Sequence, residues 1–517
     1  MLTEGPRRSD LPGLVLVTYA LVAGIVLLLQ SWSMPIVDAH GFRQTQTALS
    51  ALWITREHSL VNYTTPILGA PWSIPFEFPV YQTVVASLSS ATGLGIDHSG
   101  RLVSVLFQLG AGWFIYRLVL RLSGARDLAL LSAGTFLAAP LGLFWGRSVM
   151  IESTAVFFGV LFLWALAALR DERHAGYGLC AVLAAVSSTL VKVTTFYGFA
   201  VFACLGLAWW FFRERGWRAQ WLRSQAVVLV CAVVAVVSAL VALKLWLLHA
   251  DSLKLQTTWG GNLTSKALER WNYGTLAQRL DPDTWRNVAF GRALQDTMGK
   301  SWVFLVALIA VLTGRGTRIP GLLLLLAYLA PFLTFTNLQI VHEYYAFANY
   351  AFATAIVALA LWRVTRLENR FSVLPATLLA LWLCVLSWHR LERNYLPRME
   401  AAGVPTRVSE VARFIGEHTQ PQGVVIAFGL DWSSELAYFA DRRTIMLPDW
   451  TPVEALKRLA EGDESALGGL ALAAVVDCPN KLHDDPKRSN YYSRILERRP
   501  TGASAEIASC KIWFAQH

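Results

Sequence analysis

The chain has 517 residues, of which 55% are hydrophobic and 15% are charged, and its mean hydropathy is +0.44. Because soluble domains carry roughly 25% charged residues, this composition excludes an ordinary soluble protein and predicts an integral membrane protein. The formal net charge of +10 does not indicate nucleic-acid binding. The arginines lie in short stretches between apolar runs, as in the cytoplasmic loops of membrane proteins.

The first apolar run covers residues 14–31 and follows Arg7 and Arg8, which predicts a cytoplasmic N-terminus. Residues 79–95 are only weakly apolar, so we predict an interfacial helix there rather than a span. Apolar runs near the length that crosses a bilayer recur along the chain and give about eleven predicted spans. The later spans are 101–122, 128–146, 153–169, 176–191, 195–212, 226–248, 301–313, 319–335, 345–362 and 371–389.

The basic residues between these runs support one topology. With 79–95 kept out of the membrane core, every short basic loop falls on the cytoplasmic side. The arginines concerned are Arg117, Arg121, Arg126, Arg170, Arg173, Arg213, Arg215, Arg218, Arg223, Arg315, Arg318, Arg363, Arg366 and Arg370. The extracytoplasmic side then receives loops 32–100 and 249–300, two short turns, and the chain after the last span.

The predicted fold class is an all-α polytopic membrane domain, residues 1–390, followed by a soluble α/β domain, residues 404–517. In the second domain, strand-like apolar segments alternate with helical ones, which is typical of a small α/β layer. The strands are predicted at 423–429, 444–447, 471–477 and 510–516, and the helices at 408–418, 433–440 and 452–462. An extracytoplasmic location permits a disulfide between Cys478 and Cys510, and two free thiols are the alternative.

Ionisable groups at membrane depth are costly and indicate functional sites. Directly after the first predicted span, the segment DAHGFRQTQTA contains Asp38, His40, Arg43 and Gln44. We interpret Asp38 as a carboxylate base beside donors for a phosphate or a sugar. The alternative is a helix cap that precedes an interfacial helix.

Two further acidic sites are predicted at the same outer face. Glu77 lies between two phenylalanines in IPFEFPVYQ, which partly removes its carboxyl group from water. Arg147 and Glu152 lie in GRSVMIESTA between two predicted spans. We interpret all three as functional. A loop-surface glutamate and a plain interfacial ion pair are the respective alternatives.

Two basic or aromatic sites complete the candidates. Lys192 in TLVKVTTF is a lone charge in a long apolar stretch, and at an outer turn it could bind a lipid phosphate as a point charge. A lysine that extends to the interface is the alternative. His342 and Tyr345 lie in VHEYY at the outer start of a span, although both residue types are also common at membrane interfaces.

The order of these residues resembles the GT-C superfamily of membrane glycosyltransferases, in particular the protein O-mannosyltransferases and aminoarabinose lipid A transferases. In that group one acid follows the first span and a second precedes a proline-rich interfacial segment, as Asp38 and Glu77 do here. A third acid begins a later span, like Glu152 in MIESTAVFF, and a lysine follows, like Lys192. The resemblance covers residues 10–390.

The resemblance implies an enzyme that moves a sugar from a polyprenyl-phosphate donor to a hydroxyl of a lipid, glycan or protein acceptor. Transfer would take place on the extracytoplasmic side and invert the anomeric centre. Asp38 is the expected base, and Glu77 and Glu152 are expected to shape the acceptor and sugar sites. The expected phosphate-binding residues are Arg43, Lys192, His342 and Tyr345.

The expected location is a bacterial inner membrane. No dense spacing of His, Asp and Glu predicts a metal site, so no cofactor is expected, and a dependence on divalent metal stays open. The alternative function is a transporter or flippase for a lipid-linked sugar. Transporters tend to show paired repeats and helices broken at mid-membrane, and neither is evident in this sequence.

Overall fold

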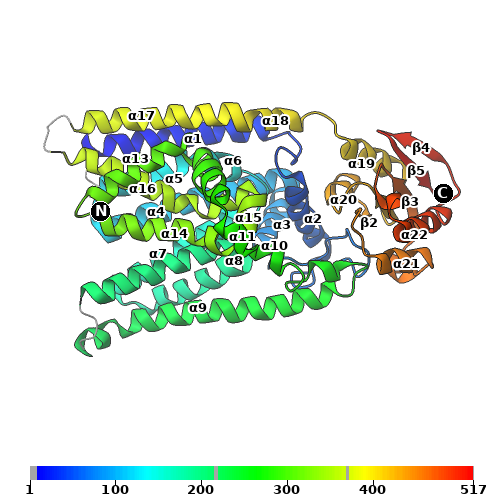
Figure 1. Ribbon diagram of the computed structural model, residues 1–517, viewed down its shortest axis with the longest axis horizontal. Coiled ribbons are helices and arrows are strands. Elements are labelled where there is room, and N and C mark those ends of the chain that lie inside the picture. The colour runs from blue at the N-terminus through cyan, green and yellow to red at the C-terminus, as the bar shows by residue number, and fades with distance from the viewer. Residues whose placement is uncertain (1–7, 215–218, 368–371, 516–517) are drawn as a thin grey trace. The chain divides into compact units, whose positions relative to one another are not determined.

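The computed structural model describes residues 8–214, 219–367 and 372–515 (Figure 1). Four arginines used in the charge argument, Arg7, Arg215, Arg218 and Arg370, lie outside the described residues. The chain forms two compact units. Unit 1 comprises Met1–Ser33, Arg101–Lys244 and Glu269–Arg398, and unit 2 comprises Met34–Gly100, Leu245–Leu268 and Met399–His517.

Unit 1 is a bundle of apolar helices. Its main helices are α1 (Leu11–Ser31), α5 (Arg126–Ala138), α6 (Pro140–Trp145), α7 (Glu152–Glu172), α8 (Ala175–Arg213), α13 (Ser301–Thr313), α14 (Arg318–Thr334), α16 (Tyr350–Thr365) and α17 (Val373–Arg390). Most of α4 (Ile96–Ser123) and α9 (Ala219–Lys254) also belongs to it. The first and last of these, α1 and α17, lie side by side (Figure 1). The helix α5 packs closely on α1, because a Cβ on Gly13 would meet the Leu130 backbone at 2.9 Å.

Shorter helical segments connect the bundle. They are η1 (Arg8–Asp10), α10 (Glu269–Tyr273), α11 (Leu276–Leu280), the π-helix η3 (Thr284–Arg292), α12 (Ala293–Met298), α15 (Thr336–Val341), η4 (Glu343–Ala348), the π-helix η5 (Leu391–Tyr395) and α18 (Leu396–Ala402).

Six helices among the described residues are long and apolar enough to cross a membrane, or seven if one bent pair counts as a single span. The predicted spans are largely helical, but 128–146 is divided between α5 and α6, and α14 and α16 have only 17 and 16 residues. The total of about eleven therefore stays a prediction. The segment predicted as interfacial forms α3 (Val80–Thr92), a helix of 13 residues that is not among the six.

The long helix α8 contains two of the predicted spans and folds back between them. Its 39 residues would measure about 58 Å if straight. Its backbone breaks at Lys192, where φ is −162° and ψ is 94°. Near its far end, the Trp210 ring lies 6.0 Å from the guanidinium of Arg170, just before its start. Both ends of α8 therefore lie at the same end of the bundle, and Lys192 is at the turn.

The predicted basic loops meet at one end of unit 1. Arg121 bonds Glu172 at 2.6 Å, which joins the loops after α4 and α7. Arg366 bonds Asp127 at 2.9 Å, which joins the end of α16 to the start of α5. These pairs agree with the prediction that the short basic loops share one side of the membrane.

Unit 2 contains a five-stranded sheet with the order β2-β1-β3-β5-β4. The strands are β1 (Val424–Phe428), β2 (Arg443–Leu447), β3 (Leu472–Asp477), β4 (Ser504–Ile507) and β5 (Cys510–Phe514). The first three are parallel, and β5 and β4 add antiparallel partners at one edge. The helices are α2 (Gly41–Glu57), α3, η2 (Gly260–Leu263), α19 (Arg407–His418), α20 (Glu435–Ala440), α21 (Val453–Ala460), η6 (Glu464–Leu467), η7 (Leu482–Asp484) and α22 (Pro486–Glu497).

The edge strand β2 is covered by the loop that precedes α3. The backbone N–H groups of Thr444 and Met446 donate to the carbonyls of Pro66 and Ile67, both at 2.9 Å. An uncovered edge would offer unpaired backbone groups to other chains. The loop after the first span therefore contributes directly to the core of the C-terminal sheet.

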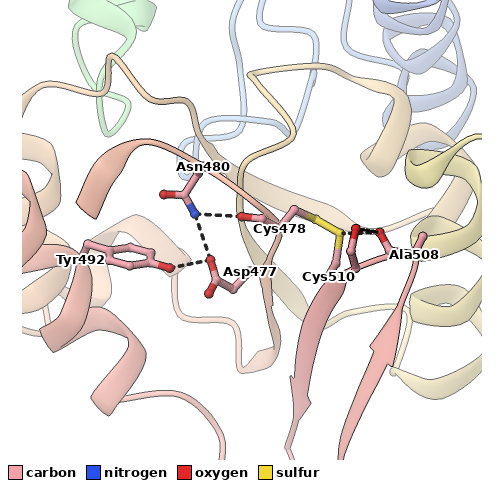
Figure 2. Close-up of a disulfide and its surroundings, with 7 residues drawn as sticks. Asp477, Cys478, Asn480, Tyr492, Ala508 and Cys510 are labelled. Atoms are coloured by element: carbon pink, nitrogen blue, oxygen red, sulfur yellow. Dashed lines mark hydrogen bonds between the residues drawn. A yellow bond between two sulfur atoms is a disulfide. The ribbon is translucent and has the colours of Figure 1, made fainter. Parts of the chain in front are cut away.

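A disulfide joins Cys478 to Cys510 (Figure 2). Cys478 directly follows Asp477 and Cys510 directly precedes Lys511, which is paired with Asp477 at the end of the β3–β5 ladder. The Cα atoms of the two cysteines are 4.1 Å apart. Beside them, Asp477 accepts hydrogen bonds from Tyr492 at 2.7 Å and Asn480 at 3.1 Å (Figure 2). Burial raises the pKa of Asp477. The structure thus has the disulfide rather than the two free thiols.

Candidate functional site

The predicted candidates form two groups, one in each unit. The first, here the loop cluster, consists of Asp38, Arg43, Gln44 and Glu77 in unit 2. The second, here the helix cluster, consists of Glu152, Lys192, His342 and Tyr345 in unit 1, and Arg147 belongs to the same unit.

In the loop cluster, Asp38 is buried, with 6% of its surface exposed. Its Oδ1 accepts a hydrogen bond of 2.7 Å from Nε2 of Gln44, which also donates to the Ala39 carbonyl at 2.8 Å. The N-cap residue of α2 is His40, in the left-handed region at φ 46°, and its side chain makes no capping hydrogen bond. Asp38 is therefore not the helix cap that the sequence left as an alternative.

Glu77 is held by two donors from the neighbouring helices. Nη2 of Arg43 bonds its Oε2 at 2.8 Å, and Nε2 of Gln82 bonds its Oε1 at 2.8 Å. Arg43 also donates to Gln46 on the same face of α2. The Tyr63 hydroxyl donates to the Glu77 carbonyl at 2.9 Å, and burial raises the pKa of Tyr63, so this donor stays neutral. Glu77 is thus an ion-paired carboxylate inside the loop cluster, not a loop-surface residue.

The centre of the helix cluster is a buried ion pair between Lys192 and Glu152. Lys192 occupies the break of α8, and Glu152 is the first residue of α7. Their side chains are 10% and 2% exposed. Among the described residues, the second oxygen of Glu152, Oε2, is buried and has no hydrogen-bond partner. Lys192 therefore does not simply extend into solvent.

Aromatic rings surround the ammonium group of Lys192. Its Nζ lies 4.0 Å from the ring centre of Tyr345 and 4.9 Å from that of Tyr344. The His342 ring stacks on Tyr344 at 5.3 Å. Arg147 is also buried, with 2% of its surface exposed, and its guanidinium carbon lies 4.6 Å from the ring centre of Phe144. Aromatic faces attract a cation, so these rings help to hold the ammonium group of Lys192 in place.

Several residues of these groups were not predicted from the sequence. Gln82 and Tyr63 bind Glu77. Lys254 is buried, with 3% of its surface exposed, and its Nζ lies 4.8 Å from the ring centre of Phe76. In the sequence, its position at the end of a long apolar run is the signal that could have identified Lys254.

Several solved structures have a fold similar to that of this chain. ArnT from Cupriavidus metallidurans bound to undecaprenyl phosphate matches with a TM-score of 0.61 at 14% identity, over 97% of each chain. The archaeal oligosaccharyltransferase AglB from Archaeoglobus fulgidus matches with a TM-score of 0.55 at 12% identity, over 93% of this chain and 70% of the other. The arabinofuranosyltransferase AftD from Mycobacteria matches with a TM-score of 0.50 at 14% identity, over 97% of this chain and 42% of the other.

The chain has the GT-C fold. The resemblance seen in the order of acids along the sequence is therefore confirmed at the level of the fold. The GT-C match to ArnT extends over nearly the whole of both chains, so it includes the C-terminal α/β region as well as the helices. Neither a scan against protein-family models nor a search of curated proteins finds a match.

Proposed function

We propose that this protein is a glycosyltransferase that takes its sugar from a polyprenyl-phosphate donor. The observation that carries the proposal is the GT-C fold shared over 97% of both chains with ArnT, a protein whose structure contains undecaprenyl phosphate. Two buried groups of acids and cations on that fold support it further. The acceptor would be a hydroxyl of a lipid, a glycan or a protein.

In the proposed reaction, Asp38 is the general base. The acceptor oxygen attacks the anomeric carbon while the bond from that carbon to the phosphate oxygen breaks. The acceptor proton passes to Asp38, and the electron pair leaves with the polyprenyl phosphate. A single displacement of this kind inverts the anomeric centre. Gln44 donates to Asp38 Oδ1, which orients the carboxylate.

The cations of unit 1 have the complementary role. Charge develops on the phosphate as the sugar leaves, and fixed donors that stabilise such charge contribute strongly to catalysis. We assign Lys192 to this phosphate, with Arg147, His342 and Tyr345 around it. We assign Glu77 and Glu152 to the acceptor and sugar sites, with Arg43 holding Glu77 in its orientation.

The proposed location of the reaction is the extracytoplasmic side of a bacterial inner membrane. The disulfide between Cys478 and Cys510 supports an extracytoplasmic C-terminal region, because disulfides persist in oxidising compartments. A flippase for a lipid-linked sugar is the rival function. The match to three glycosyltransferase structures favours transfer over transport.

The two functions differ in their product. Purified protein mixed with undecaprenyl-phosphate sugars extracted from bacterial membranes should release undecaprenyl phosphate, which mass spectrometry detects, and release should increase with added acceptor. A flippase would move the intact lipid across a vesicle bilayer instead. Transport of the intact lipid-linked sugar without release of undecaprenyl phosphate would contradict the proposal and indicate a flippase.

The proposed topology has its own test. Asn62 in NYT and Asn262 in NLT match the N-glycosylation pattern, and both side chains are exposed. Expressed in a eukaryotic membrane in the same orientation, both sites should be accessible to glycosylation, which adds mass that a glycosidase removes. Asn62→Gln and Asn262→Gln are the matched controls. Labelling of either site by a reagent confined to the cytoplasm would contradict the topology.

A further inference from the structure

One tryptophan of the C-terminal domain packs against both segments of the loop cluster. Trp432 lies in the loop between β1 and α20. Its ring meets Phe42 edge to face, with 4.6 Å between ring centres, and lies 6.0 Å from Phe76. All three residues belong to unit 2.

The two phenylalanines directly precede the charged pair of the loop cluster. Phe42 is followed by Arg43 and Phe76 by Glu77, and the 2.8 Å bond between Arg43 and Glu77 joins segments 34 residues apart. Its geometry therefore depends on how the start of α2 is placed against the loop before α3. Trp432 is the contact that both segments share.

The start of α2 needs such support more than the loop does. The Phe76 segment is anchored by Trp246, whose Nε1 donates to the Phe76 carbonyl at 3.3 Å, and by Lys254 over the ring. The side chain of His40, the N-cap residue of α2, does not cap the first turn of that helix. A Cβ on Gly41 would lie 3.0 Å from Oε1 of Glu435, so α20 also packs closely on this turn.

The loop that carries Trp432 is itself fixed by the sheet. It begins at Gly429, whose φ of +74° is a backbone conformation that residues with side chains rarely adopt. A Cβ at this position would lie 2.6 Å from the Cys478 carbonyl oxygen. The Trp432 ring lies 6.1 Å from Trp259, whose Nε1 donates to the Met446 carbonyl at 2.9 Å. Loops at the carboxyl ends of parallel strands are where α/β sheets usually meet ligands.

We propose that Trp432 is a positioning residue that holds Arg43 and Glu77 in register, so that the C-terminal domain completes the loop cluster. The catalytic part of this inference rests on the proposed function. The structural part does not, because it concerns the order of two segments within unit 2. The two parts are therefore tested by separate measurements.

The structural part is tested by hydrogen exchange on the full-length protein. Trp432→Ala should raise the exchange of backbone amides in residues 41–47 and 75–83, and Trp432→Phe should leave both segments protected because an aromatic ring remains. Trp450→Ala is the matched control. It removes an exposed tryptophan of the same domain that packs on Trp259 at 4.9 Å, and it should leave both segments unchanged.

The catalytic part is tested by the kinetics of sugar transfer. Trp432→Ala should lower kcat by roughly 10- to 100-fold, the scale expected for a misplaced catalytic group, with little change in KM for the donor. Trp432→Phe should recover most of kcat. If Trp432 acts only by positioning the Arg43–Glu77 ion pair, Trp432→Ala should lower kcat little further in a protein that already carries Glu77→Gln.

Three results would overturn the inference. The first is unchanged exchange in both segments for Trp432→Ala. The second is an equal loss of kcat in Trp432→Ala and Trp450→Ala, which would indicate a general loss of domain order. The third is a Trp432→Phe protein that folds, as judged by retained protection of β1 and β3, but exchanges as freely as the alanine variant. An absence of any transfer in the unsubstituted protein would instead contradict the proposed function.

Discussion

Asp38→Asn should leave expression and folding nearly intact and lower turnover by about 10²-fold or more, the usual scale for a lost general base. The side-chain volume hardly changes, and the amide oxygen can still accept the 2.7 Å bond from Gln44. An amide cannot take the acceptor proton. Initial rates of sugar transfer, together with thermal unfolding of the purified protein, measure the two effects separately.

The matched control is Asp441→Asn. Asp441 is a half-exposed aspartate whose carboxylate accepts hydrogen bonds from Arg56 at 2.7 and 2.8 Å, and surface ion pairs contribute only about 0–1 kcal/mol. This variant should fold and turn over like the unsubstituted protein. A well-folded Asp38→Asn protein with near-normal transfer would remove Asp38 as the base, and Glu77 or Glu152 would become the candidate.

Lys192→Ala should weaken both the fold and the binding of polyprenyl phosphate. Glu152 is 2% exposed, and removal of its cation leaves a buried carboxylate without a counter-charge, which typically costs about 3–5 kcal/mol. The same substitution removes the cation assigned to the donor phosphate. Thermal unfolding with and without added undecaprenyl phosphate measures both effects, because a ligand that binds the folded state raises Tm.

A paired variant separates the two effects. Lys192→Met with Glu152→Gln removes both buried charges at similar volume, so most of the lost stability should return. The rise of Tm with undecaprenyl phosphate should not return. Glu152→Gln alone keeps the ammonium group and should keep that rise. A paired variant that binds the lipid as the unsubstituted protein does would exclude Lys192 from the phosphate site.

Much of the helical architecture follows from hydropathy alone. Apolar runs of sufficient length coincide with helices, and the reversal at Lys192 was predicted because a lone charge in an apolar stretch is expensive except at a turn. The strands β1, β2, β3 and β5 were also predicted, since their buried positions form short apolar runs.

Two elements of the C-terminal domain were missed for a common reason. In α22 (Pro486–Glu497) only Ile495 is buried, and β4 (Ser504–Ile507) alternates between exposed and half-buried positions. Neither segment carries an apolar pattern strong enough to identify it. The register of β4 comes from pairing with β5, which a pattern in its own sequence does not encode.

The candidate site was predicted only where its residues are near neighbours in sequence. Asp38, Arg43 and Gln44 share one short segment, and their polar density was the signal. The bond from Arg43 to Glu77 and the contact of Trp432 with Phe42 join distant segments. Such pairings depend on the packing of the whole unit, so no local pattern predicts them.

The strand cover formed by Pro66 and Ile67 has a consequence for biosynthesis. The bond from Thr444 to Pro66 joins residues 378 apart in sequence. At typical synthesis rates of about 5–20 residues per second, the first loop waits roughly 20 to 75 s before its partner strand leaves the ribosome. During that interval the loop has left the membrane but lacks its sheet. Nascent chains that stop before β2 should therefore carry an unfolded first loop, and this segment is where chaperones or proteases would engage the unfinished protein.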